Sequence, residues 1–518
     1  MTFRRIVILF VALLLLCGGE VEASRRKSGQ VSISVISGER WWGLVVDDQR
    51  ASLPIERSFV LNTSSLSPST FRANVLLSSR GRFLRSREPM TVSFDGSKIV
   101  VTPTEGEVVA LEKGGRTLRE SYLVHHHKYL ADTLSTPPSR SGLELPIYEL
   151  GGDDALLYTQ EDVADFVSLL ESRGAPKGVI LLPLGWHTPS GTLSFDAVAY
   201  PDPKGMIKKL HKEGWRVMLT VSPYVMAAGR NYQRLRKAGM LLADESGQPK
   251  VFQSRYGYTA CRALTEEGAR EMRESLERLQ SEFGVDGYYL DMLDAAKLVG
   301  ESLAEREEYL SSWREVGRGL KMVIYSSPVG GPDQELVCSV STARQYTWEE
   351  LQRSLQRCIN AGLLGYTYTS LAADIDFGGD EALALRTAQL AALMPVAIIP
   401  YSVWSLECVE PFCEVLRWRC ENAEYICSVI EQSASTAEPI ARHLEYQYPR
   451  LGFANCDDEY MFGGEWLVAP VVKSGAPRMV RLPRGSWREY RSGRVFRGPR
   501  VIDFDTSDGG VPIFQRVK

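Results

Sequence analysis

The sequence predicts an α/β fold, a (β/α)8 barrel (TIM barrel) flanked by an N-terminal β-sandwich and a C-terminal β domain. The middle of the 518-residue chain alternates short apolar runs with amphipathic segments, whereas both ends carry short apolar alternations broken by Gly, Pro and Ser. Repeated strand and helix units favour parallel strands. Eight such runs favour a closed barrel over an open sheet. The runs are LPIYEL, GVILLPL, RVMLTV, DGYYLD, KMVIYS, ELVCSV, GYTYTS and VAIIPY.

The N-terminus is typical of a secretory signal peptide over residues 1–23. Arg4 and Arg5 precede an apolar run, and a cleavage pattern ends at Ala23. The run is shorter than the ~20 residues of a spanning helix. We therefore expect a secreted or lumenal protein, with an N-terminal membrane anchor as the alternative. The predicted units that follow are an N-terminal β-sandwich over 24–140, the barrel over 141–435 and a C-terminal β-sandwich over 436–518.

The composition favours a neutral ligand. A formal net charge of -4 with 24% charged residues gives no strong field, so neither a nucleic-acid groove nor a polybasic membrane patch is expected. Eight of the nine cysteines follow residue 23 and permit disulfides, with buried free thiols as the alternative. The run His125–His127 is expected on the surface. Because the Cys and His spacings resemble no metal site, we expect no metal and no cofactor.

Asp291 is the first candidate for chemistry, because it directly follows the fourth apolar run. In a (β/α)8 barrel, catalytic groups lie where strands end at the C-terminal face. Asp is also a good N-cap for the next helix. Position alone therefore leaves a catalytic role and a capping role open.

Four segments together resemble glycoside hydrolase family 31, closer to its myogenesis-regulating glycosidase branch than to the digestive α-glucosidases. They are the stretch that begins GVILLPLGWHTPSG, then DGYYLDMLD, RTAQLAALMP and YMFGGEWLVAPVVKSG, in this order and spacing. The resemblance implies retaining hydrolysis of O-glycosyl (α-glycosidic) bonds in carbohydrate metabolism. One carboxylate attacks the anomeric carbon, and a second donates and then removes a proton. Asp291 matches the nucleophile, and a carbohydrate or glycoconjugate is the expected substrate.

The resemblance fails at the expected proton donor. The family places an Asp five residues before a Trp that opens the helix after the sixth strand. Trp348 matches that Trp, but Ala343 stands five residues before it. Alanine cannot transfer a proton, so either Glu335, Asp333 or Asp374 substitutes from another loop, or the protein is an inactive or impaired member that binds a glycan or glycoprotein.

Aromatic side chains near two strand ends are expected to contact the sugar. Trp186 and His187 follow the second run, where they would stack on or hydrogen-bond a sugar ring. Trp404 follows the eighth run and is a candidate stacking platform. A core position is the alternative for Trp404.

The resemblance also implies polar sugar contacts. Asp294 follows Asp291 by three residues, and the alternative for it is a first-turn helix acid. Asp374 follows the seventh run and would line the pocket floor, with loop capping as the alternative. Arg386 keeps the family's spacing within RTAQLAALMP.

Overall fold

The structure is a computed structural model. The residues that it describes are 30–46, 54–55, 57–66, 70–103, 109–130, 143–151, 157–187, 191–254, 257–291, 299, 303–326, 328, 337–339, 346–371, 377–475 and 477–517. The predicted signal peptide lies outside these residues. No helix in the described part of the chain is long and apolar enough to cross a membrane.

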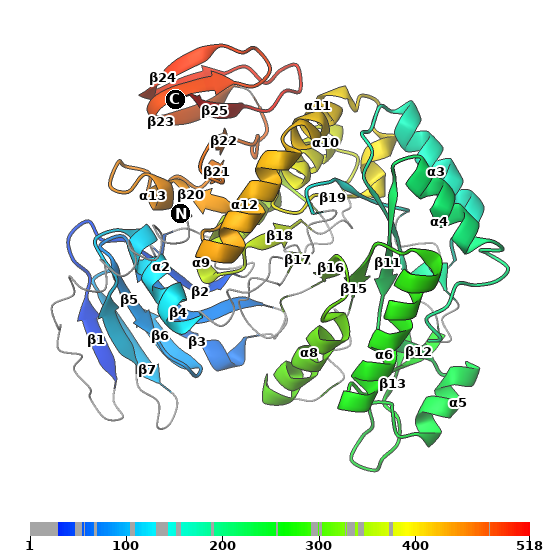
Figure 1. The fold of residues 1–518 in the computed structure, drawn as a ribbon. Helices are drawn as coiled ribbons and strands as arrows, with labels where there is room; N and C mark the ends of the chain where they lie inside the picture. The colour runs from blue at the N-terminus through cyan, green and yellow to red at the C-terminus, as the bar shows by residue number, and fades with distance from the viewer. Residues whose placement is uncertain are drawn as a thin grey trace, which may run out of the picture.

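An eight-stranded, all-parallel sheet forms the centre of the molecule (Figure 1). The amide of Val396 donates to the carbonyl of Thr369 at 3.0 Å, which joins the last two strands and closes the sheet into a barrel. Each of the eight predicted runs contributes one strand, so the predicted (β/α)8 barrel is confirmed. In sheet order, the strands are β18 (Tyr368–Ser370), β17 (Val337–Ser339), β16 (Val323–Tyr325), β15 (Gly287–Leu290), β11 (Arg216–Val221), β10 (Val179–Leu182), β9 (Ile147–Glu149) and β19 (Ile398–Ile399).

Helices cover the outside of the barrel, and their ends follow ordinary capping chemistry. The first of them begins with a capping box between Thr159 and Asp162. Another ends at Gly365, whose φ of 99° suits glycine. These helices are α3 (Gln160–Ser172), α4 (Pro203–Lys212), α6 (Glu266–Arg278), α8 (Leu303–Gly317), α9 (Trp348–Leu364), α10 (Glu381–Ala392), α11 (Glu410–Glu421) and α12 (Ala423–Thr436).

A small insertion follows the third barrel strand. It contains a three-stranded antiparallel sheet and one helix, which share a separate hydrophobic cluster around Val225 and Leu235. The insertion therefore has a core of its own beside the barrel. Its elements are β12 (Tyr224–Met226), α5 (Arg230–Lys237), β13 (Val251–Ser254) and β14 (Gly257–Cys261).

The N-terminal unit consists of two four-stranded antiparallel sheets. Side chains from both sheets, such as Trp41 and Val92, belong to one hydrophobic cluster, as in a β-sandwich. One sheet has the order β1 (Val31–Ser34), β7 (Lys98–Pro103), β6 (Met90–Phe94) and β3 (Phe59–Asn62), and the other β2 (Trp41–Val46), β4 (Phe71–Ser78), β5 (Arg82–Arg85) and β8 (Ala110–Lys113).

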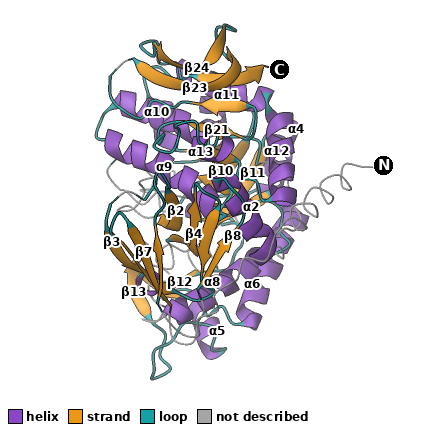
Figure 2. Ribbon diagram, turned by 90° about the vertical axis from the view of Figure 1, so that its left-hand side faces the viewer, coloured by secondary structure: helices purple, strands orange, loops and turns teal. Residues whose placement is uncertain are grey.

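The C-terminal unit is an antiparallel sheet of six strands, which lies at one end of the molecule while the N-terminal sheets lie toward the other (Figure 2). The described strands are joined in one sheet, where the sequence predicts a two-sheet sandwich. A register shift between Leu482 and Gly485 interrupts its longest pairing. The order is β20 (Ala441–His443), β21 (Tyr460–Phe462), β22 (Trp466–Val468), β25 (Ile513–Val517), β23 (Arg478–Glu489) and β24 (Val495–Phe504).

The histidine run lies in helix α2 (Leu118–Tyr129), and the expectation of a surface position is wrong for two of its three members. His125 is 5% exposed and His126 is 2% exposed. The His125 ring makes an edge contact with Phe83 at 5.6 Å between centroids. Burial lowers the pKa of His125 to about 3, so the neutral imidazole acts as a packing group.

Candidate active site at the barrel mouth

Asp291 lies one residue beyond the end of β15, at the C-terminal face of the barrel. Its amide donates to the carbonyl of Val221 at 2.8 Å, so the ladder with β11 extends to it. The side chain is half-buried, whereas Leu290 before it is fully buried. The position is the one that the sequence predicts.

The direction of the Asp291 side chain follows from its neighbours in the strand. The hydroxyl of Tyr288 donates to the carbonyl of Leu276 in α6 at 2.6 Å, so Tyr288 points outward to the helices. Successive side chains of a strand point to opposite faces. Tyr289 and Asp291 therefore point inward, and Asp291 faces the barrel axis at its mouth.

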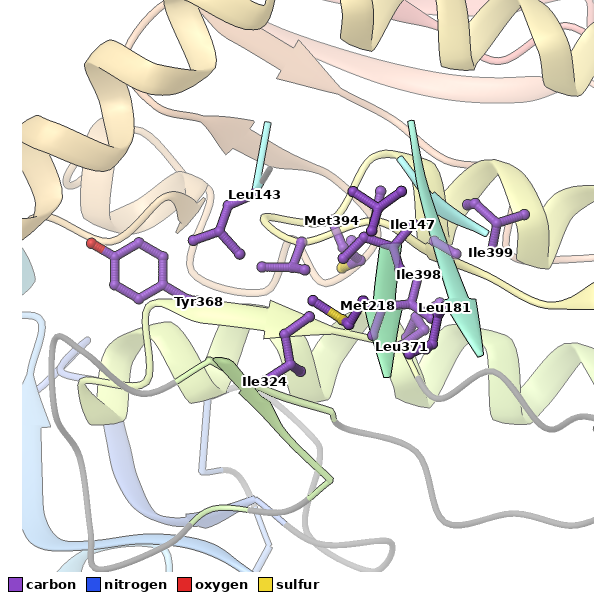
Figure 3. Packing of buried hydrophobic residues seen from close by; sticks show 14 of the residues in the cluster. Leu143, Ile147, Leu181, Met218, Ile324, Tyr368, Leu371, Met394, Ile398 and Ile399 are labelled. Carbon is purple, nitrogen blue, oxygen red and sulfur yellow. The ribbon is translucent and has the colours of Figure 1, made fainter. Parts of the chain in front are cut away.

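A second carboxylate, Glu149, ends the first barrel strand. Tyr148 before it points outward, because its hydroxyl donates to the carbonyl of Pro176 at 2.8 Å and its ring contacts Trp215 and Trp404. Ile147 packs inside the barrel with Leu181, Met218, Ile324 and Ile398 (Figure 3). Alternation then places Glu149 inward, and it is half-buried like Asp291.

The sequence motifs do not single out Glu149, because an acid within a short apolar run belongs to none of them. The signal was available: it is the last residue of the first predicted strand, where barrel enzymes place functional groups.

The two carboxylates lie at a similar height in the barrel. Glu149 pairs through Leu181 and Met218 with Gly287. Strands in a barrel tilt, so residues at one height are shifted by about one position per strand. The register pairs can be followed strand by strand around the barrel, from β9 back to β9, and they return about eight residues before the starting residue. The residue level with Glu149 therefore lies about one position later in each next strand. Glu149 is therefore level with the end of β15, where Asp291 stands.

A hydroxyl group also points inward, at about the height of these carboxylates. Thr220 follows Met218 by two residues in β11 and so shares its inward direction. It pairs with the inward-facing Tyr289. Its Oγ1 is buried and has no hydrogen-bond partner among the described residues. The barrel interior thus changes from apolar packing to polar groups toward the mouth.

Trp186 does not offer a stacking surface. It ends a 3-10 turn over Leu184–Trp186 and is fully buried. Its Nε1 donates to the carbonyl of Thr220 at 2.7 Å, and its ring contacts Phe195 edge-on at 5.0 Å. The expected sugar contact of Trp186 is therefore wrong. Its indole instead links the segment after the second barrel strand to the third strand.

Trp404 is a core residue, which was the alternative for it. It is 1% exposed. Its ring lies 5.6 Å from Tyr148 and 5.5 Å from Phe412 of α11, between centroids. The indole therefore fills the space between the barrel and its outer helices, and the expected stacking platform is not present there.

Arg386 connects α10 to the C-terminal domain and does not face the barrel mouth. Its Nη1 donates to the carbonyls of Gly509 and Gly510 at 2.6 and 2.7 Å, and its Nη2 to that of Thr506 at 2.8 Å. Gln389 joins the same carbonyl of Gly509 at 2.8 Å. The expected substrate contact is corrected to a contact between domains.

One of the remaining predicted site residues is described by the structure. His187 lies near the mouth, is 5% exposed and makes an edge contact with Trp186 at 4.6 Å between centroids. Its sugar contact stays a prediction. The other predicted positions lie outside the described residues, namely Asp294, Asp333, Glu335, Ala343 and Asp374.

Two other features lie in the C-terminal domain, away from the mouth. A cavity of about 1080 Å³ is open between α11 and the β23–β24 hairpin. Cys456, Asp458 and Glu459 bring three possible ligand atoms within 4.8 Å of one another. Arg481 already lies among them, with Nη1 2.8 Å from the Asp458 carboxylate and 3.0 Å from that of Glu459. This guanidinium supplies the positive charge that the cluster needs.

The fold and the site define a class. The protein is a (β/α)8-barrel protein with inward carboxylates at its strand ends and β-sheet domains on both sides. Family models support a closer assignment: the family 31 glycosyl hydrolase TIM-barrel domain matches residues 145–317, and the C-terminal domain of the same family matches residues 437–517. The chain belongs to glycoside hydrolase family 31 as a divergent member.

Similar proteins match this chain at low sequence identity. An α-xylosidase of Saccharolobus solfataricus is 21% identical over 403 residues, which are 69% of this chain and 53% of that protein. The myogenesis-regulating glycosidase of Mus musculus is 23% identical over 435 residues, 77% of this chain and 60% of that protein. The chain thus spans between half and two thirds of the length of these relatives.

Solved structures show the same fold. A family 31 α-xylosidase from a soil metagenome, complexed with xylose, has a TM-score of 0.75 at 20% identity and covers 94% of this chain and 79% of its own. A dextranase of Flavobacterium johnsoniae, complexed with glucose, has a TM-score of 0.79 at 15% identity, and the match covers 96% of this chain and 68% of the dextranase chain. The likeness extends across nearly the whole chain, so it includes the flanking sheet domains.

Proposed function

We propose that the protein is a glycosidase that hydrolyses α-glycosidic bonds with retention of configuration. The observation that carries this proposal is the inward, half-buried carboxylate of Asp291 at the end of the fourth strand of a family 31 barrel. Asp291 is the nucleophile. No cofactor takes part in this chemistry, because two carboxyl groups and water suffice for glycoside hydrolysis.

The reaction has two steps. The Asp291 carboxylate attacks the anomeric carbon, the bond to the leaving oxygen breaks, and a glycosyl ester forms. Water then attacks the same carbon and releases the sugar, which regenerates the carboxylate. Each step inverts the anomeric centre, so the two together retain it.

The substrate is an α-linked xyloside or glucoside, free or within a glycoconjugate. Matched relatives include proteins named as α-xylosidases and α-glucosidases. Asp294, Asp374 and His187 are the side chains that we propose to contact the sugar.

One sequence feature favours a second candidate, a binding protein without turnover. Ala343 stands where the family's proton donor is expected. Loss of a general acid costs roughly 10² to 10⁴ in rate, and poor leaving groups suffer most. A member without any replacement acid would still bind a glycan or glycoprotein at the barrel mouth.

A panel of aryl α-glycosides separates the two candidates. The purified wild-type chain and the Asp291→Ala variant are assayed with 4-nitrophenyl α-xyloside, α-glucoside and α-galactoside. The proposal expects release by the wild type alone. Equal background release from both proteins contradicts it. Release that grows with added azide in the wild type indicates a working nucleophile without its acid.

We also propose that the protein is secreted or lumenal, with an uncleaved N-terminal anchor as the alternative. Residues 1–23 have the composition of a signal peptide. Asn62 of the sequon Asn62-Thr63-Ser64 is exposed at the end of β3. N-terminal sequencing of the expressed protein tests this: a chain that begins at Ser24 supports cleavage, and one that begins at residue 1 contradicts it.

A further inference from the structure

We propose that Glu149 is the general acid and base of this site, in place of the family's missing Asp. The proposal rests on the proposed glycosidase function and names the residue that completes it. Glu149 ends the first barrel strand, far in sequence from Ala343.

The barrel strands offer few carboxylates. Within the described strands β9, β10, β11, β15, β16, β17, β18 and β19, Glu149 is the only acidic residue, and Asp291 directly follows one of these strands. Asp286 precedes β15 at the opposite end of the barrel. Its carboxylate accepts from the Val217 amide at 2.8 Å and contacts His211 at 2.8 Å. Asp286 is therefore a structural residue, and among the described residues in or directly beside these strands, Glu149 and Asp291 are the carboxylates at the mouth.

The geometry directs the two groups toward each other. Tyr148 and Tyr288 both point outward, so Glu149 and Asp291 both point inward. The register places them at a similar height, and three strand steps separate β9 from β15. They therefore face each other from different sides of the mouth.

Their exposure supports a common site. The strand residues before them, Tyr148 and Leu290, are fully buried, whereas both carboxylates are half-buried. A carboxylate within an apolar barrel is costly to bury unless it is paired or reaches solvent. Both groups meet this condition by standing at the rim of the packed interior, where a sugar can reach them.

The chemistry balances with these two groups and water. In the first step, Asp291 bonds to the anomeric carbon while the carboxyl proton of Glu149 passes to the leaving oxygen. In the second step, the Glu149 carboxylate takes a proton from a water molecule while the oxygen of that water bonds to the anomeric carbon. The Asp291 ester bond breaks, and both side chains return to their starting states.

The Glu149→Gln variant tests the proposal with two leaving groups. A phenyl α-glycoside needs protonation of its leaving oxygen, whereas the 2,4-dinitrophenyl analogue needs little. We expect Glu149→Gln to lower kcat/KM on the phenyl substrate by about 10² to 10⁴. The loss on the dinitrophenyl substrate is much smaller. The high-pH limb of the wild-type kcat/KM profile, which reports the protonated acid, disappears in the variant.

The outcomes separate this inference from the proposed function. An Asp291-dependent wild type whose phenyl glycoside turnover is unchanged by Glu149→Gln overturns the inference and leaves the function standing. A wild type that turns over neither substrate above the Asp291→Ala background overturns both. Equal losses on both substrates also overturn it, because an acid acts selectively on poor leaving groups.

Two further variants control for folding. Glu149→Asp keeps the carboxyl group but shortens its reach, so we expect partial activity that retains the high-pH limb. Should Glu149→Gln fold poorly, by circular dichroism, Glu149→Asp carries the test alone: a larger loss on the phenyl than on the dinitrophenyl substrate supports the inference, and equal losses on both overturn it. Glu161→Gln, an exposed glutamate in the first turn of α3, is the matched control with wild-type rates.

Discussion

The amide of Asp291 donates to the carbonyl of Val221, and this bond fixes the backbone of the candidate nucleophile to the neighbouring barrel strand. The bond belongs to the main chain and survives any change of the side chain. The Asp291 carboxylate therefore projects from a rigid strand, and strands hold functional groups in more precise positions than loops do.

This bond makes Asp291→Asn a clean test of the nucleophile. The amide side chain has the same shape but cannot form a glycosyl ester, so turnover of 4-nitrophenyl glycosides should fall to background. The thermal midpoint should stay close to that of the wild type. The first sugar released by the wild type should be the α-anomer, observed by proton NMR before mutarotation. A β-anomer as first product would contradict the retaining mechanism.

Arg386 should contribute to stability and leave substrate affinity unchanged. Arg386→Met removes hydrogen bonds to the buried carbonyls of Thr506 and Gly510, and one to the carbonyl of Gly509, which keeps its bond from Gln389. Leaving buried groups unpaired costs about 1 to 3 kcal/mol each. We expect the free energy of unfolding to fall by about 3 kcal/mol in urea denaturation, with KM unchanged. Arg417→Met is the control, because its half-exposed pair with Glu410 is worth only ~0 to 1 kcal/mol. A large rise in KM without loss of stability would instead support the original prediction that Arg386 contacts the substrate.

The barrel could be predicted from the sequence because its strands are buried on both faces. Such strands read as continuous apolar runs, as in GVILLPL and RVMLTV, and they recur between amphipathic helices. Asp291 could be placed for the same reason, since a strand end fixes the position of the residue that follows.

Side-chain roles were harder to predict, because they depend on partners distant in sequence. The carbonyls that Arg386 binds come from a C-terminal loop 120 or more residues away. Trp186 and Trp404 follow strands as site residues would, but each indole turns toward neighbouring elements and is buried. A run of three identical histidines does not show which of them face the core. The helical period determines this, and it brings His125 and His126 to the buried side of α2.

Trp186 should affect stability in preference to substrate binding. Trp186→Phe keeps most of the ring packing but removes the Nε1 bond to the Thr220 carbonyl. That carbonyl would be left unpaired, so the free energy of unfolding should fall by about 1 to 3 kcal/mol. KM for an aryl α-glycoside should stay within about twofold. A variant of unchanged stability with a strongly raised KM would indicate that the indole stacks on the sugar.

The buried histidines of α2 should make the protein sensitive to acid. Burial lowers the pKa of His125 to about 3, with Arg85 adding to the effect, and lowers that of His126 well below its usual value. The unfolded chain binds protons at these positions below pH 6.5, but the folded chain does not. Their contribution to stability is therefore complete above pH 6.5 and is lost as the pH falls toward 3. In that window, each such group lowers the free energy of unfolding by about 1.4 kcal/mol for each pH unit of acidification.

His125→Phe tests this sensitivity, because phenylalanine keeps a ring against Phe83 and Tyr129 and cannot titrate. We expect the free energy of unfolding to fall less steeply between pH 6 and pH 4.5 than in the wild type, measured by urea denaturation at a series of pH values. His127→Phe is the matched control on the same helix. Its imidazole is only half-buried and its pKa is lowered chiefly by that partial burial, so the change in slope should be smaller. Parallel slopes for the wild type and His125→Phe would mean that His125 already takes up its proton in the folded protein.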